Sequence, residues 1–160
     1  MISQKIDVSE ITIVENNQAI IDIFTKYLLP HFPSSTKIEV IKDDAFKYLR
    51  TNHQNFTYAF FDIYRSSDDG LPLYIKALRQ EHLYPNLHVD YWLEGSLIAL
   101  LRRIVITIIE ENYYDYKLEE EGPLDELFTY INMKIKDYTF NNYDDIKNLL
   151  TKDSLVKLVK

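Results

Sequence analysis

Three acidic residues stand at the ends of short apolar segments, and together they could line a ligand pocket. The segments and their acids are Ile11–Glu15 with Glu15, Lys37–Ile41 with Asp44, and Tyr58–Ile63 with Asp62. Segments of this length and composition predict strands that are apolar on both faces, as in parallel sheets. Parallel strands bring their C-terminal ends to one edge of the sheet, which is where α/β proteins bind ligands.

Each of the three acids suits a different part of a nucleoside ligand. A carboxylate at Glu15 could accept hydrogen bonds from both hydroxyls of a ribose. Asp44 could accept a hydrogen bond from the amino group of adenine, while the backbone N–H of Ala45 reaches a ring nitrogen. Asp62 could hold a cationic group or take a proton. Taken singly, each acid is better explained as a helix cap, whereas the three together favour a pocket.

Strand and helix patterns alternate through the first part of the chain. A fourth strand is expected at about residues 87–92. Helices are expected over residues 18–29, after Asp43 or Asp44, and from the loop Arg65–Gly70 onward. The Asp68-Asp69-Gly70 part of that loop is expected to form a turn that starts a helix. The alternation predicts an α/β fold, with helices on both faces of a doubly wound parallel sheet.

The second part of the chain is expected to be helical. Its four predicted helices cover residues 95–114, 124–137, 143–150 and 154–159. The stretch Leu97–Ile109 carries a wide apolar stripe, which predicts a mostly buried helix. The run Glu119–Pro123 is expected to interrupt the helices, because proline is favoured at a helix start. We therefore expect an α/β domain over residues 1–116 and a C-terminal helical extension over residues 117–160.

Composition excludes several classes of function. The net charge is −7 and no basic cluster is present, which argues against a nucleic-acid-binding or anionic-membrane-binding surface. The chain has no cysteine, and its four histidines show no ligand spacing, so no metal site is expected. The start of the chain is polar, and its longest apolar run, Leu97–Ile109, contains two arginines and is too short to span a bilayer. A cytoplasmic protein is expected.

The acids and their neighbouring segments resemble those of a known family. The segments that carry the resemblance are Ile11–Glu15, Leu28–Pro33, Lys37–Phe46 and Tyr58–Tyr64. They resemble class I S-adenosylmethionine-dependent methyltransferases, and within that superfamily the spermidine-synthase-like branch. The resemblance covers roughly residues 6–115, and it implies a Rossmann-like fold and a methyl- or aminopropyl-transferase activity.

The resemblance also implies roles for the acidic positions. Glu15 matches the acid that binds the ribose of the cofactor, and the pair Asp44-Ala45 matches the adenine-binding position. Asp62 matches the aspartate that faces the reacting end of the ligand, which makes it the candidate catalytic residue. The implied cofactor is S-adenosylmethionine or a related adenosyl sulfonium.

One part of the family's pattern is missing from this sequence. The family's first strand and its glycine-rich loop have no counterpart, because the only glycines are Gly70, Gly95 and Gly122. Those loop glycines let the backbone approach the cofactor closely. We therefore expect an incomplete Rossmann-like sheet. The chain would be either a fragment of a longer protein or the product of a gene that has lost the part encoding the first strand. Cofactor binding should be weak or absent, and the chain alone should not be a competent transferase.

The missing strand has a consequence for assembly. In the family that strand lies between those equivalent to residues 11–15 and 58–63, so its loss leaves two edges without partners. Unpaired edges recruit other strands. We expect residues 11–15 to pair directly with residues 58–63, or the chain to self-associate across that edge. The apolar helix at 97–109 is a second candidate for self-association.

Two other functions stay open. A receiver domain of two-component signalling would use Asp62 as a phospho-acceptor and Asp69-Gly70 as its following turn. Against it, the acidic pair is Glu15-Asn16, which weakens a magnesium site. The loop after Asp62 also lacks the expected proline, and no lysine follows the fourth strand. The third candidate is a non-catalytic interaction module on the same fold, because fold does not determine function.

Overall fold

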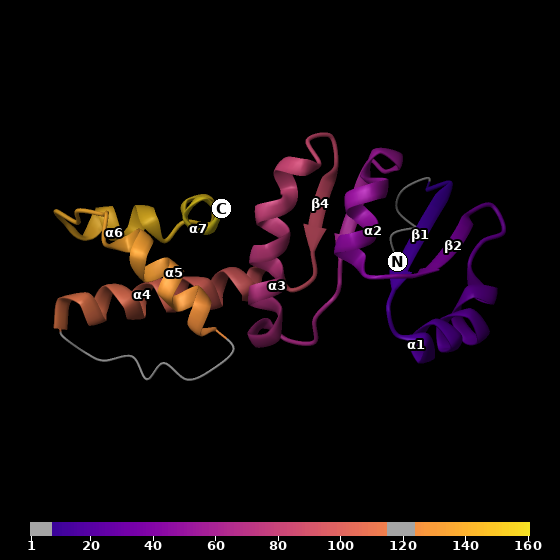
Figure 1. Ribbon diagram of the computed structural model, residues 1–160, viewed down its shortest axis with the longest axis horizontal. Helices are drawn as coiled ribbons and strands as arrows, with labels where there is room; N and C mark the ends of the chain where they lie inside the picture. Colours follow the sequence, from indigo (N-terminus) through magenta and orange to yellow (C-terminus); the bar gives the residue numbers. More distant parts are fainter. Residues whose placement is uncertain (1–7, 115–123) are drawn as a thin grey trace. The chain divides into compact units, whose positions relative to one another are not determined.

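The computed structural model describes residues 8–114 and 124–160, and the chain divides into two compact units. The first unit is Met1–Asn55 and the second is Phe56–Lys160. Figure 1 follows the chain from indigo at the N-terminal unit to yellow at the C-terminal helices. Each unit is described by itself.

The N-terminal unit is built on a two-stranded parallel ladder. Its elements are β1 (Glu10–Glu15), α1 (Gln18–Ile23), the π-helical turn η2 (Phe24–Leu28), the 3₁₀ turn η3 (Leu29–His31), β2 (Lys37–Lys42), α2 (Ala45–Asn52) and the 3₁₀ turn η4 (His53–Asn55). The ladder runs in register from Glu10 opposite Lys37 to Glu15 opposite Lys42. Isoleucine, valine and threonine dominate β1, as expected for a strand, because branched side chains suit the pleated surface.

The N-terminal unit buries very little of its apolar surface. Among its described residues, only Phe46 and Leu49 are buried, and both lie on α2. No residue of α1 or of η2 is buried. A unit of this size with so small a core has little hydrophobic stabilisation to set against the entropy of ordering its chain.

The C-terminal unit contains a second two-stranded parallel ladder and most of the helices. Its elements are β3 (Tyr58–Phe61), α3 (Ser67–Gln80), the 3₁₀ turn η5 (Glu81–Leu83), β4 (His88–Tyr91), α4 (Glu94–Tyr114), α5 (Asp125–Ile135), α6 (Tyr143–Leu149) and α7 (Lys152–Val159). The ladder pairs Tyr58 with His88 and Phe61 with Tyr91. In Figure 1, α3 and β4 are drawn next to each other, and the long helix α4 leads away from them toward α5.

The core of the C-terminal unit is centred on α4. Its apolar stripe is buried, and α4 packs against α3, α5 and α7. The buried members of the stripe are Leu97, Ile98, Leu101, Ile104, Val105, Ile108 and Ile109. In the β3–β4 ladder, neighbouring residues of a strand face opposite sides: Phe61 and Tyr91 are buried, whereas Phe60 and Asp90 are exposed. The expected mostly buried helix is confirmed.

Much of the expected fold is confirmed. Strands and helices alternate, strands pair in parallel, and the chain after β4 is helical among the described residues. The four strands lie within a residue or two of their predicted positions. β3 ends at Phe61, so Asp62 follows the strand instead of belonging to it. The run Glu119–Pro123 and the predicted domain boundary after residue 116 lie outside the described residues.

The expected single sheet is not formed. The described strands make two two-stranded sheets, β1 with β2 and β3 with β4. Direct pairing of residues 11–15 with residues 58–63 is not among these ladders, so β1 is paired on one side only instead of lying at the centre of a sheet. Each ladder pairs two strands that are consecutive in the chain, for which the entropy of closing the connecting segment is smallest, and each lies within its own unit.

Candidate functional site

Glu15 and Asp44 lie at the same edge of the N-terminal ladder. Glu15 is the last residue of β1 and stands opposite Lys42, the last residue of β2; Asp44 comes two residues later. Because β1 and β2 are parallel, both acids belong to the C-terminal edge, as predicted. Ala45 is the first residue of α2 and therefore lies at this edge too.

Both acids accept a local backbone hydrogen bond close to the start of a helix. One oxygen of Glu15, Oε1, accepts a hydrogen bond from the backbone N–H of Asn17 at 2.7 Å. Asp44 is the N-cap of α2, and its Oδ1 accepts from the backbone N–H of Lys47 at 2.8 Å. In each carboxylate the second oxygen makes no hydrogen bond within the described residues, so it could still accept one from a ligand.

Two charged residues close to Asp44 in the chain, Asp43 and Lys47, also lie near this edge of the ladder. Asp43 accepts from the backbone N–H of Asp44 at 2.9 Å and from Nζ of Lys47 at 2.9 Å. The hydrogen bond with Lys47 is the main cause that lowers the pKa of the Asp43 carboxyl below its ordinary value. The backbone N–H of Ala45 makes no hydrogen bond within the described residues, as is usual in the first turn of a helix.

Asp62 belongs to the C-terminal unit, and its side chain is exposed. It directly follows β3, so it lies at the C-terminal edge of the β3–β4 ladder. Of the four residues predicted to form one site, the structure brings together Glu15, Asp44 and Ala45 in one unit and places Asp62 in the other.

Tyr64 is a packed aromatic beside Asp62 in the chain. Its side chain is buried, and its hydroxyl donates to the backbone carbonyl of Trp92. Burial, followed by the charges of Asp62 and Glu94, raises the pKa of Tyr64 to about 12. The phenol therefore stays protonated near neutral pH and acts as a donor. Gly70 makes room for the ring, because a Cβ there would lie 2.6 Å from Cδ2 of Tyr64.

The segment Asp68-Asp69-Gly70 starts helix α3, as predicted. Ser66 and Asp69 form a capping box, in which Oδ1 of Asp69 accepts from the backbone N–H of Ser66 at 2.7 Å. Oδ2 of Asp69 accepts from the backbone N–H of Arg65 at 3.1 Å. The side-chain hydrogen bond from Ser66 is the largest of the effects that lower the pKa of Asp69 to about 2.

Sequence reasoning missed two groups of interacting side chains in the C-terminal unit. In the first, Glu94 accepts from the hydroxyl of Tyr74 at 3.0 Å and from Nζ of Lys152 at 2.6 Å. In the second, Glu81 accepts from the hydroxyl of Tyr91 at 2.9 Å and from Nζ of Lys160 at 2.7 Å. The members of each group lie far apart in the chain, so no local spacing predicts them.

The two groups meet at their tyrosine rings. The rings of Tyr74 and Tyr91 pack edge to face, with centroids 4.8 Å apart. Burial, together with the charges of Glu94 and Glu81, raises the pKa of both phenols above the ordinary value. Both tyrosines therefore act as hydrogen-bond donors and not as bases. The groups tie α7 and Lys160 to α4 and η5, which is a structural role.

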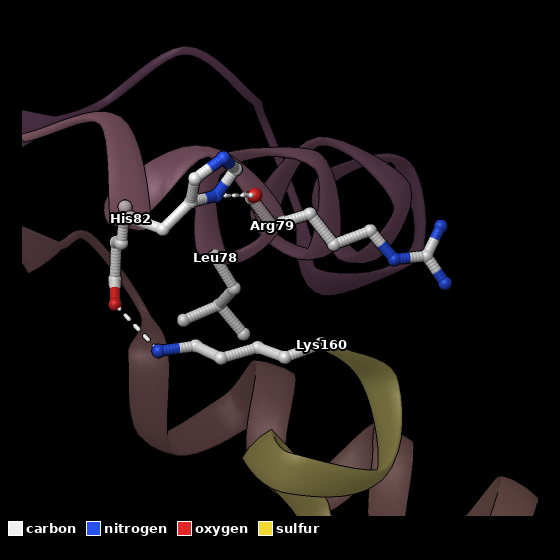
Figure 2. A pocket seen from close by; sticks show the side chains of 5 residues that line it. Leu78, Arg79, His82 and Lys160 are labelled. Atoms are coloured by element: carbon white, nitrogen blue, oxygen red, sulfur yellow. Dashed lines mark hydrogen bonds and ion pairs between the residues drawn. The ribbon is translucent and has the colours of Figure 1, made fainter.

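An open pocket of about 470 Å³ lies next to the second group. Its lining residues are Leu78, Arg79, Glu81, His82 and Lys160. Figure 2 shows that the guanidinium of Arg79 points away from His82 and from the ammonium of Lys160. Nε of Arg79 donates to the backbone carbonyl of Val159 at 2.6 Å, and Nδ1 of His82 lies 2.8 Å from the carbonyl of Arg79. The polar groups do not converge on one point, so this pocket is not a ligand site of the usual kind.

Within residues 8–114 and 124–160, no group of three or more histidine, aspartate or glutamate residues is placed to hold a metal ion. None of the helices in the described parts of the chain has the length and apolar character needed to cross a membrane. Comparison with known protein families, with curated proteins and with solved structures finds no match for this chain.

Proposed function

We propose that this chain is a methyltransferase-like protein of the incomplete Rossmann-like type, whose N-terminal unit keeps the adenosine half of an S-adenosylmethionine site. The observation that carries the proposal is the position of Glu15 and Asp44 at one edge of the β1–β2 ladder. Each carboxylate has an oxygen that makes no hydrogen bond within the described residues. In the proposed complex, Glu15 accepts from the ribose hydroxyls, Asp44 accepts from the adenine amino group, and the N–H of Ala45 donates to a ring nitrogen.

The proposed protein is not a competent transferase by itself. No glycine precedes Gly70, so the close backbone contacts that a glycine-rich loop makes to the cofactor have no source in the first 69 residues. Losing about half of the contacts to a cofactor costs several kcal/mol, and each 1.4 kcal/mol is about tenfold in affinity. We therefore expect weak binding of adenosine and of adenosyl sulfonium compounds.

The test is a titration of the full chain with adenosine, S-adenosylmethionine and its decarboxylated form, followed by amide NMR shifts. Glu15→Gln and Asp44→Asn are the informative variants. Each keeps an oxygen that can accept the local backbone hydrogen bond, but each removes the negative charge from the ligand-facing oxygen. We expect shifts at Glu15, Asp44 and Ala45 in the wild type, and affinity at least tenfold weaker in either variant.

Asp145→Asn is the matched control, because Asp145 is also a carboxylate that accepts a backbone hydrogen bond at the start of a helix, in α6. It should leave ligand binding unchanged. Absence of any shift with all three ligands would refute the proposal and favour the non-catalytic interaction module. Incorporation of phosphate at Asp62 from acetyl phosphate and magnesium would replace the proposal with a receiver domain.

A further inference from the structure

Two groups at the start of α2 present a hydrogen-bond acceptor next to a donor. They are the carboxylate oxygen of Asp44 that makes no hydrogen bond within the described residues and the backbone N–H of Ala45. Adenine carries the complementary pair, an amino donor beside a ring-nitrogen acceptor. Hypoxanthine carries the reverse pair, a carbonyl acceptor beside an N–H donor. A site that holds its acceptor and donor in fixed positions therefore distinguishes the two bases, because the wrong base leaves both groups unpaired.

Three hydrogen bonds hold Asp44 in its position before α2. Its backbone N–H donates to Oδ1 of Asp43 at 2.9 Å, and its own Oδ1 accepts from the backbone N–H of Lys47 at 2.8 Å. Its carbonyl accepts from the backbone N–H of Tyr48 at 2.9 Å. The backbone N–H, the carbonyl and one carboxylate oxygen of Asp44 are thus engaged, and the second carboxylate oxygen remains for a ligand.

Lys47 joins the two acids into one closed arrangement. Its ammonium donates to Oδ1 of Asp43 at 2.9 Å, while its backbone N–H donates to Asp44. The same oxygen of Asp43 therefore accepts both the ammonium of Lys47 and the backbone N–H of Asp44. The side chain of Lys47 is 69% exposed, and an exposed ion pair between residues four apart stabilises a helix only slightly. Removing the ion pair should therefore release Asp43 while the fold persists.

On the basis of the proposed adenosine site, we propose that Asp43 and Lys47 are positioning residues that make this site selective for nucleosides of 6-aminopurine. Neither contacts the ligand. Asp43 fixes the backbone of Asp44 and occupies its N–H, so that a base meets the free Asp44 oxygen beside the N–H of Ala45. Lys47 holds Asp43 and the other Asp44 oxygen in place, which keeps the carboxylate from turning away from the amino group.

The test compares adenosine with purine riboside, which lacks the amino group, and with inosine, which carries hypoxanthine. Amide NMR titration of the full chain gives the three dissociation constants. In the wild type we expect adenosine to bind about tenfold tighter than purine riboside, with inosine weakest. In Asp43→Ala and in Lys47→Met the preference for adenosine over purine riboside should fall about fivefold, because the amino group loses its oriented acceptor. Both nucleosides are uncharged, so the change in protein charge affects them alike.

Conservative and matched variants separate positioning from other effects. Asp43→Asn keeps an oxygen for the N–H of Asp44, and Lys47→Arg keeps the ion pair, so both should retain most of the preference. Lys147→Met is the matched control, because Lys147 forms an ion pair with Asp144 in the first turn of α6. It should leave all three dissociation constants unchanged. Circular dichroism verifies that each variant keeps its helix content.

Failure of the positioning role and failure of the proposed function give different results. A wild type that binds none of the three nucleosides, or binds them equally, refutes both. A wild type that prefers adenosine, and keeps that preference in Asp43→Ala and Lys47→Met, overturns the positioning role and leaves the proposed site standing. Equal weakening of adenosine and purine riboside in the two variants also overturns it, because a purely structural role acts on both ligands alike.

Discussion

Gly70 shows how a single residue determines whether a helix start and a buried ring can pack together. A Cβ at this position would lie 2.6 Å from Cδ2 and 2.7 Å from Cγ of Tyr64. Those atoms belong to the ring near its attachment to the backbone, and the hydroxyl at the other end is held by the carbonyl of Trp92. The ring therefore cannot move aside easily.

Replacing Gly70 by alanine should destabilise the protein. Alanine favours helix by up to about 1 kcal/mol, but the clash with a buried ring costs about 1–3 kcal/mol more than that gain. Gly95→Ala is the matched control, since Gly95 also lies in a helix, and among the described residues an added Cβ there would meet no atom within 4 Å beyond its chain neighbours and its own helix backbone. It should be neutral or stabilising by up to about 1 kcal/mol. Urea unfolding measures both, and equal effects would contradict the packing argument.

The low pKa of Asp69 predicts that the free energy of unfolding depends on pH in the acidic range. Its folded pKa of about 2 lies below the ordinary value of 3.8, so the unfolded chain binds more protons between these values. The stabilisation is fully present above about pH 4 and is lost as the pH falls through about 2. The free energy of unfolding of Asp69→Asn should therefore approach that of the wild type on acidification. Chemical unfolding at a series of pH values measures this.

The neighbouring acid provides the control for that experiment. Asp68 lies in the same helical turn, and its side chain makes no hydrogen bond within the described residues. The difference between Asp68→Asn and the wild type should change less with pH than the difference for Asp69→Asn. Equal pH dependence in the two variants would mean that the capping box is not the source of the effect.

At the scale of secondary-structure elements, the C-terminal unit depends on contacts between helices that are distant in the chain. Helix α7 packs on α3, α4 and α5, and Leu155, Leu158 and Val159 are buried. At the N-terminal end of α7, Lys152 binds Glu94, and directly after α7, Lys160 binds Glu81. Each glutamate also accepts a hydrogen bond from a buried tyrosine, which orients the carboxylate.

Tyr74→Phe should show how much these buried hydrogen bonds contribute. Tyr74 is fully buried, and removing its hydroxyl leaves Glu94 without one of its two donors. A hydrogen bond to a charged group contributes about 1.5–3 kcal/mol, and we expect a loss of about 2 kcal/mol in the free energy of unfolding. Tyr143→Phe is the control, because Tyr143 is 69% exposed, and it should change stability by less than about 0.5 kcal/mol. A similar loss in both variants would contradict the assignment.

At the scale of the whole molecule, the two units differ greatly in the apolar surface that each buries. In the described N-terminal residues two side chains are buried, whereas the C-terminal unit buries an extended set from β3 through α7. Local stability follows burial, because burial supplies most of the free energy that opposes unfolding.

We expect the units to unfold in separate steps at concentrations too low for self-association. Backbone amides of β1, β2 and α1 should exchange with deuterium much faster than those of β4, α3 and the apolar part of α4. Trp92 is the single tryptophan and lies in the C-terminal unit, so its fluorescence should change at higher urea than the circular dichroism signal begins to change. One coincident transition by both probes, with uniform exchange, would refute this.

The positions of the elements could be predicted from the amino-acid sequence because their signals are local. Branched residues in short runs predict β1 and β2, and Asp44 and Asp69 are placed where helices start. The C-terminal edge that holds Glu15, Asp44 and Ala45 follows from the parallel pairing of neighbouring strands. These features depend on residues within a few positions of one another, so the tertiary environment changes them little.

Only the tertiary structure decided which apolar faces are covered and which acids lie together. The stripe on α4 and the row Ile20, Ile23, Tyr27 and Leu28 on α1–η2 are both apolar in sequence, but α3, α5 and α7 pack on the first, whereas the residues of the second are exposed. The Tyr74–Glu94–Lys152 and Tyr91–Glu81–Lys160 groups join residues up to 79 positions apart, and Asp62 falls in a different unit from Glu15. Burial depends on contacts between segments distant in the chain, and a local pattern carries no information about which segment provides them.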